Sequence, residues 1–380
     1  MRNVKELYLK LEEELNGFIF GYENEIRSYI LGHLTKTNVA LLGDPGIGKT
    51  FSATKFAEAF PTKKAKQFFS VQLEPFTAPA KVFGPVDILK LKEGTYELRS
   101  EEFLPNSKIA LLDELTRGKA VLDALLEIVN EKTYDVNGSK KQSELEMVIT
   151  TTNFKFDSNH FEAMRDRFLQ WTYPKKLDLN DRELIKRYWR KTKKAANVSV
   201  RITEEEVAQA RAEVQAIEVS EDAADAFLDI LIELKKNHGI EVSQRRHDWI
   251  FNTIVKAQAW LNGHTEVETE DLEVVWTCLW ADEAQIPTVQ KVVRKFTNPE
   301  KNLINEVFEG VQIKIQGWRT NPVENPTGQV SKDLQMMLNQ LKKIKSPKPA
   351  NLPMYNVAMT LVERSQEMVA EVLHQSQSTI

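Results

Sequence analysis

A glycine-rich loop between two apolar segments constrains this chain more than any other feature. The short apolar run 38–42 predicts a buried strand, and the segment 51–57 holds no helix breaker and predicts the start of a helix. The loop between them consists of Gly43, Asp44, Pro45, Gly46, Ile47, Gly48, Lys49 and Thr50. A strand, a glycine loop and a helix in this order form an anion site, because backbone N–H groups point inward and glycines let the backbone approach phosphates closely.

Two side chains would give this loop its chemistry. Lys49 would reach the β- and γ-phosphates of a nucleotide, and the hydroxyl of Thr50 would join the ligand shell of a Mg²⁺ ion. The same residues could also form a glycine-rich turn in front of a helix, with no ligand. A second element of the site is needed to decide between these two interpretations.

That second element is a pair of carboxylates at the end of another apolar run. Residues 109–112 predict a buried strand, and Asp113 and Glu114 follow it directly. Ligands of an open α/β sheet collect beyond the carboxyl ends of its strands. We therefore expect Asp113 to hold Mg²⁺ through water and Glu114 to orient and polarise the attacking water. A solvated acidic turn is the alternative, which the upstream loop disfavours. Together the two elements predict binding and hydrolysis of a nucleoside triphosphate.

The composition fits an intracellular protein with two or three domains. The chain has 380 residues and a formal net charge of −4, so no global field favours nucleic acid or an anionic membrane. No stretch is apolar for long enough to span a bilayer, and the N-terminus lacks the pattern of a signal peptide. The single cysteine, Cys278, lies between Trp276 and Trp280, which predicts a packed thiol in a reducing compartment. We expect a cytoplasmic location without membrane insertion.

The first part of the chain, residues 1–176, alternates strand and helix signals. This alternation predicts an α/β domain with a parallel sheet covered on both faces. Five strands are expected, at 38–42, 66–71, 109–112, 147–152 and 168–173. Pro174 and the two lysines after it then break the pattern as a linker would.

The second part, residues 177–286, has apolar residues at helical spacing and predicts an all-helical domain. Thr203 with Glu206 fits a capping box, and Thr269 is expected to cap a later helix. The basic run 186–194 could be a nucleic-acid patch, but the balanced charge favours a solvated helix face.

The third part, residues 287–380, gives the weakest signal. Prolines interrupt it, and only two helices are expected, around 334–341 and 357–372. Their apolar faces would have to be covered by the second domain or by a partner. We therefore expect a C-terminal appendage that is mostly helical or irregular.

Several local segments add to the order of the motifs. Ile19–Glu23 lies before the phosphate loop, and an insert at 82–105 precedes the acidic strand. Residues 125–131 follow the carboxylates and lead to Tyr134–Gly138, whose Asn-Gly pair is typical of a tight hairpin. In this order, over residues 18–286, the chain resembles an AAA+ ATPase of the MoxR family, near its RavA-like branch.

The resemblance implies further parts of a nucleotide site. Ile19 and Phe20 stand where the family has its adenine-side segment, before the first helix. Phe51, directly after the phosphate loop, is also expected to contact the nucleotide. Asn153, just past the fourth strand, matches the sensor-1 residue that helps to position the lytic water. A strand-end asparagine that makes an Asx-turn is the alternative for Asn153.

Arginines complete the resemblance. Arg167 lies in the segment where the family carries its arginine finger, which would serve the γ-phosphate of the neighbouring subunit. Arg165 is the competing candidate for that role. Ser243–Arg245 lies where the family has Ser-Pro-Arg, so the resemblance assigns Arg245 to sensor 2, with Arg246 facing elsewhere on the helix.

The resemblance implies an oligomeric ATPase, a hexameric ring or spiral, that uses ATP and Mg²⁺ to remodel or activate a protein partner. Such a partner is often a von Willebrand A-domain protein. A nucleic-acid motor and a slow-turnover, nucleotide-dependent scaffold are the alternatives. Lys140 and Lys141 near the hairpin favour the motor weakly, but the hairpin lacks an aromatic and basic cluster and the chain is slightly acidic. We favour the protein partner and do not expect nucleic acid.

Overall fold

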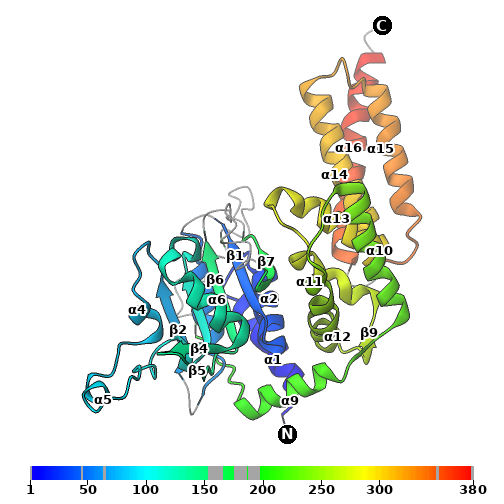
Figure 1. Ribbon diagram of the computed structural model, residues 1–380. Helices are drawn as coiled ribbons and strands as arrows, with labels where there is room; N and C mark the ends of the chain where they lie inside the picture. Colours follow the sequence, from blue (N-terminus) through cyan, green and yellow to red (C-terminus); the bar gives the residue numbers. More distant parts are fainter. Residues whose placement is uncertain are drawn as a thin grey trace. The chain divides into compact units, whose positions relative to one another are not determined.

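The computed structural model describes residues 2–43, 46–62, 66–152, 166–174, 186, 197–347 and 351–377. It divides into two compact units, Met1–Val289 and Gln290–Ile380. Figure 1 shows both units, and each is described by itself below. The three-part division at 176/177 and 286/287 stays a prediction.

The first unit is built on one sheet. Its strands are β1 Asn38–Leu42, β2 Lys66–Gln72, β3 Ser107–Asp113, β6 Met147–Thr152 and β7 Phe168–Thr172. They are parallel, in the order β2-β3-β6-β1-β7. All residues of β1, β6 and β7 are buried, as strands covered on both faces require. The predicted five-stranded parallel sheet is confirmed.

The register of this sheet brings three strand ends together. Leu42 of β1 is paired with Thr152 of β6, and Leu112 of β3 is paired with Thr150 of β6. Because the strands are parallel, their carboxyl ends lie on the same side of the sheet, and the segments that follow them all begin there. The phosphate loop after β1 and Asp113 at the end of β3 therefore meet there.

The described helices that accompany the sheet include α1 Val4–Asn16, α2 Glu23–Thr35, α3 Lys49–Ala57 and α6 Leu122–Glu131. The side chain of Asn3 caps α1 by accepting a hydrogen bond from the N–H of Glu6. In α1 the buried residues Val4, Tyr8, Leu11 and Leu15 recur every three or four positions. The segment with Ile19 and Phe20 thus precedes the second helix and not the first, which corrects the sequence-based expectation.

Short elements connect β2 to β3 and β3 to β6. They are α4 Pro79–Phe83, α5 Ile88–Lys92, and the 3₁₀ turns η1 Leu104–Asn106, η2 Leu115–Arg117 and η3 Lys119–Val121. After α6, β4 Thr133–Val136 pairs with β5 Ser139–Gln142 in antiparallel fashion. Asn137 and Gly138 between them have φ of 55° and 80°. Positive φ at both positions is what a two-residue hairpin turn requires, so the predicted tight hairpin is confirmed.

The remainder of the first unit is mainly helical. It contains α9 Glu204–Gln215, β8 Glu218–Val219, α10 Glu221–His238, α11 Gln244–Trp249, η4 Ile250–Ile254, α12 Val255–Asn262, β9 Glu266–Val267, η5 Thr269–Cys278 and η6 Glu283–Gln285. Thr203 and Glu206 form the predicted capping box at the start of α9.

One helix differs from the expectation. η5 is a 3₁₀ helix, and Glu268 caps it in a reciprocal box with Asp271, where Thr269 was expected as the cap. The buried residues Leu272, Val275 and Cys278 recur every third position, which fits the three residues per turn of a 3₁₀ helix.

The second unit contains a three-helix bundle. After α13 Ile286–Thr297 come α14 Pro299–Thr320, α15 Thr327–Lys342 and α16 Leu352–Gln377, which pack pairwise side by side (Figure 1). Their shared core holds Ile304, Val307, Val311, Val330, Leu334, Leu338, Leu341, Ala358, Val362 and Val369. The expectation that another domain or a partner covers these faces is therefore wrong, because the three helices cover one another. The bundle also contains α14, which the sequence did not indicate.

Candidate nucleotide-binding site

The phosphate loop joins β1 to α3. Gly46 and Gly48 have φ of 79° and 95°, in the left-handed region that favours glycine. Gly48 is the N-cap residue of α3, which begins at Lys49. A Cβ atom placed on either glycine would meet no atom within 4 Å. The backbone here is therefore open toward a ligand, at the N-terminus of a helix, which is the setting that binds phosphate.

Lys49 lies at the centre of the site. Its Nζ donates hydrogen bonds to the backbone oxygens of Gly43, at 2.6 Å, and Thr152, at 3.5 Å. The residue is only 8% exposed. The ammonium group is thus held between the carboxyl ends of β1 and β6, next to the N-terminus of α3, where it can also donate to a phosphate in the loop.

Asp113 accepts hydrogen bonds from three segments at the carboxyl ends of the strands. Its Oδ2 accepts a hydrogen bond from Thr50 Oγ1 at 3.1 Å, and its Oδ1 accepts one from Thr151 Oγ1. The backbone oxygen of Asp113 accepts from the N–H of Leu73 at 2.8 Å. The structure therefore places the two sequence-predicted Mg²⁺ ligands, a hydroxyl and a carboxylate, in direct contact.

Glu114 follows in an unusual backbone conformation. Its φ is 58°, in the left-handed region that residues other than glycine rarely adopt. Such outliers concentrate at functional sites. Beyond it, Thr116 Oγ1 lies 2.9 Å from Thr152 Oγ1 and ties the start of η2 to the end of β6.

The predicted adenine-side segment contacts the phosphate loop. Ile19 and Phe20 are buried. Nearby, Tyr22 donates from its hydroxyl to the backbone oxygen of Ile47 at 3.0 Å. The ring of Phe18 packs edge-on against Phe51 of α3, with centroids 6.4 Å apart. Four of the predicted site residues, Asp44, Pro45, Asn153 and the alternative finger Arg165, lie outside the described residues.

Arg167 lies at the opposite ends of the strands, where the parallel strands begin. It directly precedes β7, and its backbone oxygen accepts a hydrogen bond from Asn38 Nδ2 at 3.0 Å, at the start of β1. Lys49 and Asp113 lie beyond the carboxyl ends of the strands. The strand β7 has five residues and therefore separates the amino ends of the strands from their carboxyl ends by about 17 Å, at ~3.3 Å per residue. The backbone of Arg167 is thus remote from the phosphate loop of its own chain.

Arg245 and Arg246 have opposite environments in α11. Arg245 is exposed, donates from Nη2 to Asn130 Oδ1 at 2.9 Å and lies over the ring of Trp249. Arg246 is buried and donates to the backbone oxygens of Phe168, Leu169 and Cys278, at 2.9, 2.6 and 3.0 Å. Sequence reasoning missed this contact, since two adjacent arginines look alike until the burial of α11 is known. No described contact brings Arg245 to the phosphate loop.

Glu25, which the sequence analysis also missed, is a buried carboxyl group in the first turn of α2. It is 4% exposed. Burial raises its pKa to about 7, against the lowering effect of a hydrogen bond from its own backbone. Its environment is polar on the side of β7, where Gln170 Nε2 donates to the backbone oxygen of Ser28 at 3.1 Å.

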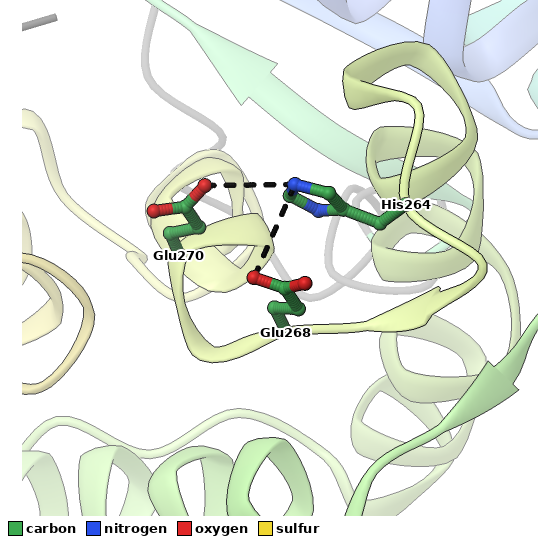
Figure 2. A group of neighbouring side chains, drawn as sticks. All are labelled: His264, Glu268 and Glu270. Carbon is green, nitrogen blue, oxygen red and sulfur yellow. Dashed lines mark ion pairs between the residues drawn. The ribbon is translucent and has the colours of Figure 1, made fainter. Parts of the chain in front are cut away.

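A cluster of titratable groups in the helical part could hold a metal ion. His264, Glu268 and Glu270 each turn a ligand atom toward the others (Figure 2). Nε2 of His264 lies 3.6 Å from Glu270 and 4.0 Å from Glu268, while Nδ1 lies 2.9 Å from the fully buried Asp271. Burial lowers the pKa of His264, but the hydrogen bond to Asp271 and the three carboxylates outweigh it and raise the pKa. We interpret the cluster as a network of carboxylates around one imidazole, which becomes an ion-pair network when His264 is protonated.

The residues at the sheet edge fit a nucleotide with Mg²⁺. Open left-handed glycines at the start of α3, the Lys49 ammonium and the oxygen pair of Thr50 and Asp113 are complementary to phosphate and to a hard cation, respectively. Among the described residues, no helix is long and apolar enough to cross a membrane.

Comparisons with known proteins add relatives. A family model described as the MoxR domain in the MoxR-vWA-beta-propeller ternary systems matches residues 9–212, and a model of the AAA lid domain matches residues 223–293. An uncharacterized protein of Methanocaldococcus jannaschii is 30% identical over 292 residues, which are 76% of this chain and 74% of that protein. The chaperone MoxR1 of Mycobacterium tuberculosis is 27% identical over 161 residues, 41% of each chain.

A solved structure supports the fold. A protein from Cytophaga hutchinsonii that is assigned as an ATPase matches 77% of this chain and 94% of its own, with a TM-score of 0.59 and 20% identity. The MoxR model covers more than half of the present chain and includes both the phosphate loop and the carboxylates that follow β3. The chain therefore belongs to the MoxR family of AAA+ ATPases.

Proposed function

We propose that this protein binds ATP with Mg²⁺, hydrolyses it, and uses the energy to remodel or activate a protein partner. One observation carries the proposal, the hydrogen bond of 3.1 Å between Thr50 Oγ1 and Asp113 Oδ2. It joins the end of the phosphate loop to the end of β3, which is where a nucleotide-bound Mg²⁺ needs a hydroxyl and a carboxylate.

The other residues take roles around this contact. Lys49 neutralises the phosphates, Glu114 polarises the attacking water, and Asn153 helps to position that water. Bound Mg²⁺ supplies charge stabilisation to the transferred phosphoryl group. Arg245, on the helical lid, acts as sensor 2. Its bond to Asn130 at the end of α6 links the lid to the segment that follows the catalytic carboxylates.

The proposed assembly is a hexameric ring or spiral. The position of Arg167 supports this assembly. Its backbone lies at the amino ends of the strands, whereas the phosphate loop of the same chain lies at their carboxyl ends. An arginine there acts on a nucleotide only across a subunit boundary. Arg165 remains the competing candidate for this role.

A protein is the proposed partner, and a von Willebrand A-domain protein is the first candidate. The description of the matching family model, in which MoxR and vWA proteins occur in one system, supports this choice. Exposed apolar residues of the insert, Ile88 and Leu89 in α5, also suit a protein surface. We also propose that the chain belongs to the RavA-like branch of the family, because its insert at 82–105 resembles the insert of that branch.

The hairpin argues against a nucleic-acid motor. Lys140 of β5 forms ion pairs with Glu127 and Glu131 of α6, at 3.3 and 3.2 Å. A lysine whose charge is matched by two carboxylates contributes little to phosphate binding. Salt-dependent binding of labelled single- and double-stranded DNA tests this point, and a steep loss of affinity with salt would favour the motor.

A pair of substitutions tests the ATPase. Lys49→Ala should abolish ATP binding, because the loop loses its ammonium group. Glu114→Gln should keep ATP binding and lose phosphate release, because the residues around Mg²⁺ stay unchanged. Lys55→Ala is the matched control, since Lys55 lies in the same helix and pairs with Glu58. Normal turnover in Glu114→Gln, or normal binding in Lys49→Ala, would contradict the proposal.

The Glu114→Gln variant also tests the partner. With ATP bound it should retain a von Willebrand A-domain protein from the same cells, and the Lys49→Ala variant should not. Retention that is equal with and without ATP would count against coupling between the nucleotide and the partner.

A further inference from the structure

The second unit carries a groove that its own core does not fill. The groove has a volume of about 520 Å³ and is formed by α14 and α16 alone. Its lining residues are Val311, Gln312, Ile315, Gln316, Arg319 and Thr320 of α14, and Leu361, Arg364, Ser365 and Met368 of α16. No residue of α15 takes part, so the groove belongs to the side of the α14–α16 pair that α15 leaves open.

The lining residues form two matched helical stripes. On α14 the positions 312, 315, 316 and 319 follow the spacing i, i+3, i+4 and i+7, and on α16 the positions 361, 364, 365 and 368 repeat it. Each stripe covers two turns of one helix face. Two parallel stripes of this length make a trough for a third helix, as in helix-in-groove recognition.

The chemistry of the groove is apolar at its floor and cationic at its walls. Ile315, Leu361 and Met368 supply apolar surface, and the fully buried Val311 lies beneath them. Arg319 stands on one wall and Arg364 on the other, and no lining residue is a carboxylate. Arg319 donates to the sulfur of Met368 at 3.3 Å. Within the described part of the chain, neither arginine forms an ion pair.

We propose that this groove binds an acidic amphipathic helix of a partner protein, with its apolar face on the floor and carboxylates against Arg319 and Arg364. The arginines select negative charge, because a guanidinium and a carboxylate form strong, often bidentate, hydrogen bonds. The volume is in the range of pockets that accept several side chains.

A second copy of this chain is a poorer occupant. Two copies of the groove facing each other would bring arginines together without a carboxylate from either lining. Nucleic acid is disfavoured as well, since the floor is aliphatic and offers no aromatic ring for a base to stack on. The binding does not rest on ATP hydrolysis, and it is to be measured in the wild type and in the Lys49→Ala chain.

Fluorescence anisotropy with two synthetic peptides tests the proposal on the full-length protein. Both peptides have leucines at i, i+3, i+4 and i+7, and the positions beside that stripe carry Glu in one and Lys in the other. The Glu peptide should bind at least tenfold more tightly. Arg319→Glu and Arg364→Glu should each weaken it about tenfold and strengthen binding of the Lys peptide. Equal affinity of the two peptides for the wild type would overturn the proposal.

Matched controls separate binding from folding. Lys332→Glu makes the same charge change on exposed α15, outside the groove, and should leave binding unchanged. Ile315→Ser should weaken binding, whereas Ile313→Ser, at a position 69% exposed and outside the groove, should not. Circular dichroism checks that each variant is folded. A dimer in light scattering that Arg319→Glu abolishes, or competition of labelled DNA with the Glu peptide, would overturn the proposal in favour of those occupants.

Discussion

Arg246 of α11 donates a hydrogen bond of 2.6 Å from Nη2 to the backbone oxygen of Leu169, in the edge strand β7. The same Nη2 donates to Cys278 of η5, and Nη1 donates to Phe168. One guanidinium thus satisfies three carbonyl groups from two elements. Burying a charge is favourable only when it is fully hydrogen-bonded, so this arginine ties the helical part of the first unit to the sheet.

Replacing Arg246 should destabilise the first unit. Arg246→Met keeps most of the volume but removes a donor from three buried carbonyl groups, of which that of Phe168 keeps Trp171 Nε1 at 2.6 Å, and we expect a loss of about 3 kcal/mol. Arg245→Ala is the matched control and should cost less than ~1 kcal/mol, because Arg245 is exposed. Urea unfolding followed by tryptophan fluorescence measures both.

Cys278 gives this prediction a local readout. It is the single cysteine of the chain, it is fully buried, and burial raises its pKa to about 11. A thiol reagent should therefore label it slowly in the wild type. Labelling should be faster in Arg246→Met and unchanged in Arg245→Ala. Equal labelling rates in the two variants would show that Arg246 does not hold this part of the fold together.

The contrast between these arginines shows where sequence reasoning stops. The strands β1 and β3 follow from local apolar runs, and the hairpin follows from Asn137-Gly138, since these signals depend on neighbouring residues only. The choice between Arg245 and Arg246 depends on which side of α11 packs against β7. That information lies in contacts between residues 77 and 78 positions apart, so no local pattern carries it.

The same reason explains the errors in the third part. The apolar residues of α14 are recognisable as one face only when the positions of α15 and α16 are known. Polar residues of α14 that line the groove interrupt its apolar pattern. Prolines suggested irregular structure, yet Pro326 is the N-cap of α15 and Pro353 lies in the first turn of α16. Proline is tolerated at these positions, where its missing N–H would have no helical partner.

Arg167→Ala should bind ATP normally and hydrolyse it at least tenfold more slowly, since an arginine finger is worth about 10³–10⁵ in rate. The hydrogen bond from Asn38 should persist, because it goes to the backbone oxygen of Arg167, and circular dichroism checks that the variant is folded. Mixing this variant with Lys49→Ala should restore part of the activity, as a mixed interface joins an intact loop to an intact finger. Absence of rescue at every mixing ratio, with assembly verified by light scattering, would rule out action in trans.

Glu25 should make stability fall as the pH rises. Its pKa is raised from its ordinary 4.5 to about 7 in the folded chain, so the folded state favours the protonated form. Its carboxyl group costs nothing below pH 4.5, and the cost grows until the pH passes 7. Glu25→Gln should be more stable than the wild type at pH 8, by on the order of 3 kcal/mol, and similar near pH 4.5. Glu23→Gln is the control, because Glu23 lies in the same turn but is exposed. A difference that stays constant with pH would contradict this assignment.

His264 should act in the opposite direction. Its pKa is raised in the folded state, so its contribution to stability is complete below its ordinary value of 6.5 and is lost as the pH rises through the folded value. His264→Gln should remove this dependence, and His238→Gln, at an exposed helix end, should not. A chelator should leave the wild-type curve unchanged if the cluster is an ion-pair network, and a lower melting temperature with chelator would instead indicate a bound metal.

Removal of α16 by truncation after Ser346 should unfold the second unit and spare the first. The truncation strips one side of a three-helix core and uncovers the apolar faces of α14 and α15, which two helices of this length do not keep folded on their own. The phosphate loop, Asp113 and the sheet all lie in the first unit, so ATP binding should remain. Limited proteolysis should cut within 299–342 in the truncated chain and not in the full chain. A point substitution checks the cause. Val362→Ala, fully buried, should cost roughly 2 kcal/mol, and Val372→Ala, 40% exposed on the same helix, should cost little. Protection of 299–342 after truncation would mean that α16 is not part of the core that holds this unit together.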